Sequence, residues 1–255
     1  MSISVQTIKS DFKVHDFDLF ETLVDLLQKS RIKLENGNIV IISSKYVANS
    51  QGRLVEYDKI IPSNESRILA TKFHLSPEIA EIILRESDII FGGVPGFVIT
   101  SSDNILAPNA GIDKSNAPKG KIILYPVEAY QIAEQLRRKF FLRFSVHIGI
   151  LIIDSRLMPA RVGTTGIAIA CSGMEPVLDI RGQKDLVGNP LKVTFQAVAD
   201  NLASIANLKM GESSDSTPIV VIKNADVKMT DRKMNQHEMA ISHEQCVYMR
   251  GLKTK

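Results

Sequence analysis

The chain has 255 residues, of which 44% are hydrophobic and 23% charged, and its formal net charge is +3 at pH 7. This composition is typical of a globular protein with a sizeable core, and the scattered lysines and arginines do not form the basic patch of a nucleic-acid-binding protein. The longest apolar runs are too short to span a bilayer. Cys171 and Cys246 lie far apart without metal-ligand spacing, so we expect reduced thiols in a cytoplasmic protein without a signal peptide.

Short apolar segments separated by turn residues fill the first half of the chain. Residues 4–8 predict a strand, and an aspartate within residues 16–18 is expected to cap the amphipathic helix that follows. The apolar strand at residues 38–43 ends directly at Ser44 and Lys45, which places a hydroxyl and a cation in the next loop. Further segments predict helices at residues 63–73 and from Pro77 onward, a hairpin at 97–107, a strand at 121–125 and a helix at 127–140.

A nearly continuous run of branched apolar residues at 148–153 predicts a strand buried on both faces. We expect it to end at Asp154 and Ser155, whose oxygens are the ligands that a hard cation prefers. The simpler alternative for a single aspartate is the cap of a turn. The remaining segments predict a polar loop at residues 179–188, a strand at 191–194, a helix at 198–210 that ends near Gly211, a strand at 218–222, and a helix or loosely ordered tail at 226–255.

The common phosphate-binding and nucleophile motifs are absent from the sequence. It contains no G-x-x-x-x-G-K-[ST], no G-x-G-x-x-G that opens a helix, and no Ser-His-Asp or Cys-His arrangement. Three acidic residues, Asp113, Asp154 and Glu212, instead lie beside glycine or at the end of a strand. Each alone more often caps a turn or faces solvent. If they converge, they form an oxygen-only site for Mg²⁺ or Mn²⁺ that leaves room for phosphate oxygens.

Several of these segments together resemble the coenzyme F420-0:L-glutamate ligase family over about residues 17–222. The resemblance implies an α+β fold (mixed α/β) whose subunits form an intertwined homodimer. It also implies a ligase-like domain at residues 1–225, followed by a polar segment of uncertain order at residues 226–255. It further implies a GTP-dependent enzyme that adds L-glutamate through a γ-glutamyl amide bond to coenzyme F420-0, or to a related acid, by way of an acyl phosphate. The segments that carry it are Asn109-Ala-Gly-Ile-Asp113 with Asn116, Ile153-Asp154-Ser155, residues 179–188, and residues 199–212 with their terminal Met-Gly-Glu.

The resemblance implies a role for each matched residue. Ser44 and Asn116 match positions that contact the nucleotide. K⁺ is implied as a further cation beside Mg²⁺ or Mn²⁺. The matched divalent-metal positions are Asp113, Asp154, Ser155 and Glu212.

The sequence departs from the family where phosphate is expected to bind. Members usually carry Ser-Lys-Ala-Glu-Gly where this chain has residues 48–52, so that Asn49 replaces a lysine and Gln51 a glutamate; Val162 replaces an arginine. Cations offset the charge on a transferring phosphoryl group, which makes Lys45 the candidate catalytic replacement. The alternative hypothesis is a non-catalytic or altered-substrate relative that binds nucleotide or another small molecule.

Overall fold

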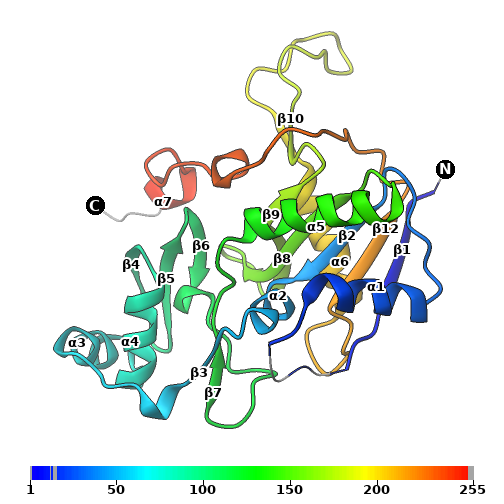
Figure 1. Cartoon of the computed structure of the whole chain (residues 1–255). Helices are drawn as coiled ribbons and strands as arrows, with labels where there is room; N and C mark the ends of the chain where they lie inside the picture. The colour runs from blue at the N-terminus through cyan, green and yellow to red at the C-terminus, as the bar shows by residue number, and fades with distance from the viewer. Residues whose placement is uncertain (1, 12, 14–15, 252–255) are drawn as a thin grey trace.

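The structure, a computed structural model, describes residues 2–11, 13 and 16–251. Its centre is a five-stranded mixed sheet (Figure 1) in which β2 and β8 run parallel and the other neighbouring pairs are antiparallel. The strands predicted at residues 4–8, 38–43 and 218–222 are confirmed within this sheet. In spatial order the strands are β1 (Ser4–Ile8), β12 (Ile219–Lys223), β2 (Ile39–Ser43), β8 (Gly149–Leu157) and β9 (Thr164–Ser172).

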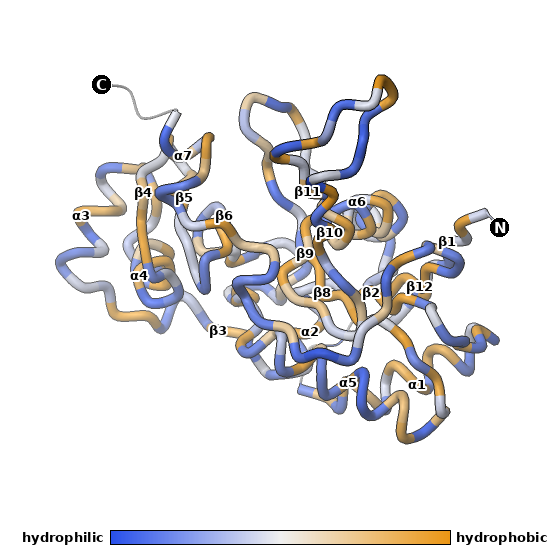
Figure 2. The backbone as a smooth tube through the Cα atoms, turned by 90° about the horizontal axis from the view of Figure 1, so that it is seen from above, coloured by the Kyte–Doolittle hydropathy of each residue, from blue (hydrophilic) through white to orange (hydrophobic). Residues whose placement is uncertain are grey.

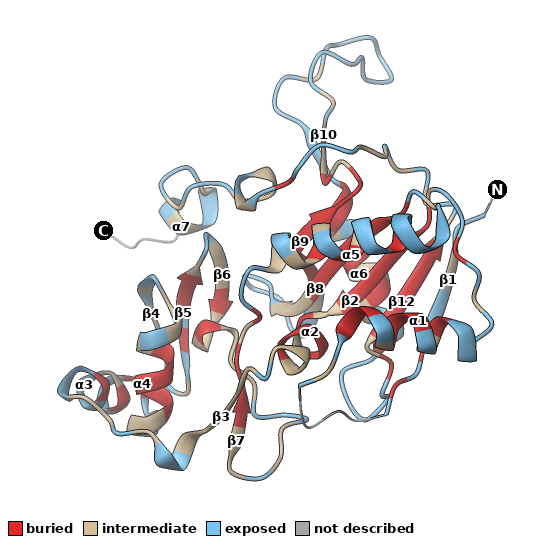
Figure 3. Cartoon of the chain, viewed as in Figure 1, coloured by how far each residue is buried: buried red, intermediate tan, exposed pale blue. Residues whose placement is uncertain are grey.

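Helices cover both faces of the sheet because its central strands are apolar on both sides. In β8, Ile150 and Ile152 belong to the core on one face. Leu151 and Ile153 belong to the core on the other face, and the sheet is accordingly the most continuous buried region in Figure 3. The first face is covered by α1 (Leu19–Lys29) and α5 (Ala129–Phe144), and the second by α6 (Val198–Met210).

Three helices begin at capping residues, the first of them at a predicted aspartate. Asp18 caps α1 by accepting a hydrogen bond from the backbone N–H of Glu21 at 2.9 Å. Ser63 and Ser76 cap the next two long helices in the same way, and Pro77 occupies a first-turn position where its missing N–H costs nothing.

A smaller module lies beside the central sheet (Figure 1). It contains the predicted hairpin, now part of a three-stranded antiparallel sheet, and a separate apolar core in which Ile83 and Ile122 are fully buried. Its elements are β3 (Leu54–Glu56), η1 (Tyr57–Lys59), α3 (Asn64–Phe73), α4 (Pro77–Glu86), β4 (Ile89–Val94), β5 (Phe97–Ser102), β6 (Ile105–Pro108), η2 (Asn109–Gly111) and β7 (Lys121–Ile123).

Two predictions are wrong, namely the end of the strand at residues 148–153 and the loop after the strand at residues 38–43. The strand expected to stop at Asp154 runs on to Leu157, because β9 pairs with it throughout and keeps it extended. Lys45 lies in a short helix, α2 (Ser44–Ser50), instead of in a loop. This helix begins directly after β2 and buries the side chains of Tyr46 and Val47, so packing supports a turn of helix that the sequence does not announce.

The segment between β10 (Val177–Asp179) and β11 (Phe195–Ala197) projects from the body of the molecule (Figure 1). We call residues 180–194 the arm. The polar loop predicted at its start is confirmed, but the strand predicted at 191–194 is wrong. Val193 is 82% exposed, so the apolar residues of this stretch have no core to order them as a strand.

The C-terminal segment packs back onto the protein. Arg232 forms ion pairs with Glu175 at 2.6 Å and with Glu238 at 2.7 Å, and Met234 is buried in the core beside α6. Short helical turns follow at η3 (Gln236–Glu238) and α7 (Val247–Gly251); the last residues of the predicted tail, 252–255, lie outside the described residues. Across the described ranges, no helix combines the length and apolar character needed to cross a membrane.

Candidate active site

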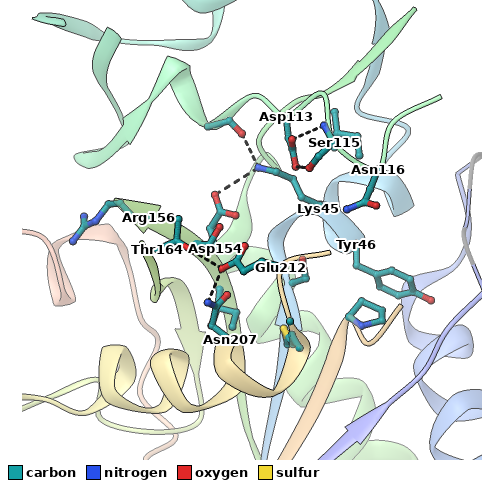
Figure 4. A pocket seen from close by; sticks show the side chains of 18 of the residues that line it. Lys45, Tyr46, Asp113, Ser115, Asn116, Asp154, Arg156, Thr164, Asn207 and Glu212 are labelled. Atoms are coloured by element: carbon teal, nitrogen blue, oxygen red, sulfur yellow. Dashed lines mark hydrogen bonds and ion pairs between the residues drawn. The ribbon is translucent and has the colours of Figure 1, made fainter. Parts of the chain in front are cut away.

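A polar pocket of about 570 Å³ opens where α2, the turn after β6, the end of β8 and the segment after α6 meet (Figure 4). Six of the seven predicted site residues line it, although they are spread over most of the sequence. Ser44 does not line the pocket but holds one of the residues that does. The six lining residues are Lys45, Asp113, Asn116, Asp154, Ser155 and Glu212.

The parallel pairing of β2 with β8 brings the first group of these residues together. Ser43 pairs with Ile153, so the next residues along the two strands, Ser44 and Asp154, emerge side by side. The Ser44 hydroxyl donates a hydrogen bond to Asp154 Oδ1 at 2.9 Å. Lys45 Nζ lies 3.5 Å from Asp154 Oδ2, which leaves the carboxylate fixed between a hydroxyl and a cation.

Lys45 is directed into the pocket by two further contacts. Its Nζ donates to the backbone carbonyl of Gly111 at 2.6 Å and lies 5.1 Å from the centroid of the Tyr125 ring. Burial and the neighbouring Asp154 carboxylate raise the pKa of the Tyr125 phenol well above its ordinary value. Tyr125 therefore stays neutral and provides an aromatic face for the lysine.

The turn that presents the Gly111 carbonyl is strained. Asn109, Ala110 and Gly111 have consecutive positive φ values of 50°, 56° and 67°, a conformation that costs free energy at the two residues with a side chain. The Asn109 side chain offsets this by accepting a hydrogen bond from the Val98 N–H at 2.8 Å. Only glycine fits at the third position, because a Cβ there would lie 2.3 Å from the Tyr125 ring. This turn thus requires the glycine of the Asn-Ala-Gly sequence and is stabilised by its asparagine.

Asp113 and Asn116 lie on the opposite side of the pocket from Glu212 (Figure 4). The backbone of Asp113 forms a bridge with Ile123, and its carboxylate accepts hydrogen bonds from the Ser115 N–H at 2.7 Å and from the Ser115 hydroxyl at 2.8 Å. This carboxylate is therefore held by its own loop and is accessible from the pocket.

Glu212 is held at the end of α6 by two neutral donors. Its Oε1 accepts hydrogen bonds from the Thr164 hydroxyl at 2.7 Å and from the Asn207 amide at 2.9 Å. The preceding Gly211 has φ of +77°, and a Cβ there would lie 2.1 Å from the Asp215 carboxylate. The Met-Gly-Glu sequence thus combines a helix end with a close approach of the backbone to a carboxylate.

The acidic side chains of the pocket do not form a complete metal site by themselves. Within residues 2–11, 13 and 16–251, no three His, Cys, Asp or Glu side chains lie close enough to hold a metal ion alone. The oxygens of Asp113, Asp154 and Glu212 nevertheless line one pocket. Magnesium typically takes one or two carboxylates and completes its shell with water and substrate phosphates. The predicted metal site is compatible with this arrangement and stays a prediction.

The departures from the family pattern have local explanations. The Asn49 amide donates to the Lys13 carbonyl at 3.4 Å and lines the pocket without a charge. Gln51 donates to the carbonyl of Val127 at 2.9 Å and accepts from its N–H at 3.1 Å. A glutamate could accept but could not donate, so this pair of hydrogen bonds suits glutamine. Val162 is fully exposed on a loop.

Sequence reasoning missed several pocket residues. Tyr125 and Thr164 carry no local motif that marks them. Asn207 opens the segment that ends in Met-Gly-Glu, and its spacing of five residues from Glu212 could have identified it as a partner. Arg156 follows the two strand-end oxygens directly and lines the pocket because β8 extends beyond its predicted end.

The fold and the pocket define a mixed α+β protein with a small-molecule-sized pocket lined by both acidic and basic side chains. A family model described as F420-0:Gamma-glutamyl ligase matches residues 7–224. The chain therefore belongs to the F420-0:Gamma-glutamyl ligase family, whose members are ligases.

Individual relatives match over most of their length. A protein of Methanopyrus kandleri named coenzyme F420:L-glutamate ligase is 35% identical over 223 residues, which are 87% of this chain and 87% of the relative. Proteins of the same name from Methanocaldococcus jannaschii and Archaeoglobus fulgidus are 37% and 31% identical. The match to the Methanocaldococcus protein covers 78% of this chain and 80% of the relative. The match to the Archaeoglobus protein covers 95% of this chain and 97% of the relative.

Proposed function

We propose that this enzyme joins L-glutamate to coenzyme F420-0, or to a closely related acid, in a reaction that consumes GTP. The names of the relatives support the acceptor and the amino acid. The observation that carries the proposal is the pocket itself, in which Lys45, three carboxylates and Asn116 surround a space large enough for a small molecule.

The proposed chemistry has two steps. A carboxylate oxygen of the acceptor attacks the γ-phosphorus of GTP, the bond from that phosphorus to the β–γ bridging oxygen breaks, and GDP leaves. The glutamate amine then attacks the acyl carbon of the resulting acyl phosphate. The carbon–oxygen bond to phosphate breaks, inorganic phosphate leaves, and the amine nitrogen loses a proton as the amide forms.

Lys45 is proposed to stabilise the charge on the transferring phosphoryl group. Its ammonium already lies in the pocket, 3.5 Å from Asp154 Oδ2, and a lysine acts on phosphate as a mobile point charge. Asp154 and the Gly111 carbonyl orient it in the absence of substrate. Asn116, on the facing loop, is proposed to donate to the nucleotide.

Asp154 and Asp113 are the residues proposed to hold Mg²⁺ or Mn²⁺, with Ser155 and Glu212 beside them. When bound, the cation neutralises negative charge on the nucleotide phosphates. The chain's own contribution is to fix these oxygens on β8, on the turn after β6 and at the end of α6. K⁺ is proposed only as an accompanying cation.

Trapping of the intermediate tests the proposal. Hydroxylamine converts an acyl phosphate into a hydroxamate and inorganic phosphate. With GTP, Mg²⁺ and coenzyme F420-0 present and glutamate omitted, we expect hydroxamate to form in an amount equal to the GDP produced. Glutamate should suppress it by competing for the acyl carbon. GDP without hydroxamate or amide product would contradict the acyl-phosphate route.

A non-catalytic binding role is favoured by one observation, the uncharged Asn49 amide at the position of the family lysine. The same assay separates the two functions. If the protein binds GTP but releases no GDP with any acceptor, whereas the Asn49→Lys variant does, the binding role is correct.

We also propose that the protein forms a homodimer. The arm and its surroundings expose large apolar side chains, and Figure 2 shows an apolar tip on the arm. Leu186 and Val187 at this tip are 107% and 82% exposed, which is typical of a surface that another chain covers. Light scattering should give the mass of two chains at micromolar concentration, and Leu186→Asp with Val187→Asp should shift it toward one. A compact monomer for the unchanged protein would contradict the dimer.

A further inference from the structure

A second cavity, of about 760 Å³, lies beside the polar pocket and has a different character. Its size falls within the range of about 300–1,000 Å³ that is typical of cofactor-sized ligands. One wall is common to both spaces and includes residues 106–108, Arg156 and Leu157. The other walls include six aromatic and thioether side chains among smaller apolar residues, namely Phe91, Tyr130, Met158, Met239, Tyr248 and Met249.

The C-terminal segment covers this cavity. We call residues 234–251 the strap. Arg232, just before it, is anchored to the central module by its ion pair with Glu175. Further along, the His243 ring packs on Phe91 of β4 with ring centroids 4.7 Å apart. The strap therefore spans from the central sheet to the smaller module, as Figure 1 shows, and closes the space between them.

Two polar side chains at the cavity could bind a ligand. His243 Nε2 is buried without a hydrogen-bond partner among the described residues, and buried polar atoms normally have one. Arg156 lies on the common wall between the two spaces, where a guanidinium suits an anionic group that passes from one to the other.

We propose that the cavity beneath the strap binds a planar aromatic ring system of the acid acceptor, while the acceptor's reacting carboxylate lies in the polar pocket. Aromatic faces and methionine sulfurs favour flat, polarisable rings. The strap then acts as a specificity-determining wall, and it lies outside residues 7–224 matched by the family model. This inference rests on the proposed function, because it assigns a place to that acceptor.

The experiment fills the cavity without touching the polar pocket. Ala240→Trp places an indole on the strap side, and Ile99→Trp places one on the opposite wall in β5. Gln245→Trp adds the same group to an exposed strap position that lines neither space. Coenzyme F420-0 is titrated into each full-length protein without GTP or glutamate, and its fluorescence anisotropy is followed. Thermal unfolding verifies that each variant is folded.

We expect Ala240→Trp and Ile99→Trp each to raise the acceptor Kd at least about tenfold, which corresponds to about 1.4 kcal/mol. Gln245→Trp should stay within about twofold of the unchanged protein. The Kd for GTP, measured by calorimetry, should be the same in all four proteins. Folded cavity variants that bind the acceptor as tightly as the unchanged protein would overturn the inference, and so would an unchanged protein that does not bind it. Binding that is lost on filling, in a protein that never ligates glutamate, would instead contradict the proposed function alone.

Discussion

The polar pocket and the apolar cavity share one wall, but their remaining walls come from different parts of the chain. Every charged residue assigned to the pocket lies within residues 7–224, on the central sheet or the turns that it holds. Much of the cavity is closed by the strap, which begins after this range. The proposed reacting groups are therefore held by the main fold, whereas the proposed acceptor contacts also depend on the C-terminal strap. Substitutions in the cavity should therefore leave GTP binding unchanged, and substitutions in the pocket should leave acceptor binding unchanged.

The largest effect is expected at Lys45. Lys45→Ala should lower kcat at least about 100-fold, or about 2.7 kcal/mol, because the transferring phosphoryl group loses the ammonium proposed to stabilise its charge. The acceptor Kd should be unchanged, since the cavity is untouched. Lys45→Arg should restore only part of the rate, because a guanidinium is larger and planar.

Two companion variants make the Lys45 result interpretable. Lys119→Ala removes an exposed lysine that does not line the pocket and should have no effect on kcat. Asn49→Lys, added to Lys45→Ala, restores the family residue and should recover activity in part. Full glutamate ligation by Lys45→Ala alone would show that this lysine has no catalytic role.

The next effect is expected on nucleotide binding. Asp154→Asn removes the negative charge that holds Lys45. It also replaces one proposed metal-binding oxygen with an amide nitrogen. GTP affinity in the presence of Mg²⁺ should fall about tenfold or more, consistent with the loss of a charged hydrogen-bonded group, and its dependence on Mg²⁺ should weaken. Calorimetry with and without Mg²⁺ measures both, and Asp226→Asn at an exposed position serves as the control. If GTP affinity and its Mg²⁺ dependence are unchanged, the cation binds elsewhere.

A third prediction concerns the contact between α5 and β9, where the Ser172 hydroxyl donates a hydrogen bond to the Glu134 carboxylate. Burial opposes ionisation of Glu134, but hydrogen bonds from Arg137, Ser172 and Arg138 outweigh it and lower its pKa to about 2. A lowered carboxyl pKa stabilises the folded state above the ordinary value of 4.5, and the stabilisation is lost as pH falls from 4.5 toward 2.

Glu134→Gln should accordingly lower the free energy of unfolding at neutral pH by about 1–3 kcal/mol. The difference from the unchanged protein should shrink across the acid window and disappear near its lower end. Urea unfolding at several pH values measures this. A difference that stays constant with pH would mean that Glu134 is not ionised in the folded protein as its contacts require.

The smallest effect is expected where the strap is anchored. Arg232→Ala breaks the partly exposed ion pairs to Glu175 and Glu238, which are worth about 0.5 kcal/mol in total for acceptor binding. The acceptor Kd should rise about twofold, and the GTP Kd should not change. Arg181→Ala, which removes an ion pair on the arm, is the matched control. A larger change in GTP binding than in acceptor binding would contradict the separation of the two spaces.

Much of the central sheet could be predicted because its strands are short, continuous apolar runs bounded by turn residues. The helix caps at Asp18, Ser63 and Ser76 were equally predictable from side chains that satisfy free N–H groups. The pocket residues could be proposed from their positions beside glycines and strand ends. Their convergence could not, because it depends on the register of Ser43 with Ile153 across 110 residues of chain.

The errors arose where tertiary contacts override local pattern. Asp154 and Ser155 continue a strand because β9 pairs with them, and Ser44 begins a helix because its neighbours have a core to bury. The cavity could not be predicted at all. Its strap contributes Met239 and Met249 from a polar stretch without periodicity, and only the fold places them at the cavity wall.

The central claim is that the pocket around Lys45 carries out GTP-dependent ligation of glutamate. Mass spectrometry of coenzyme F420-0 after incubation with the full-length protein tests it most directly, with GTP, L-glutamate and Mg²⁺ each omitted in turn. We expect an acceptor heavier by one or more glutamyl residues only in the complete mixture, with one GDP formed per residue added, and no heavier acceptor with Lys45→Ala. An acceptor of unchanged mass in the complete mixture, or glutamate addition that proceeds without GTP, would contradict it.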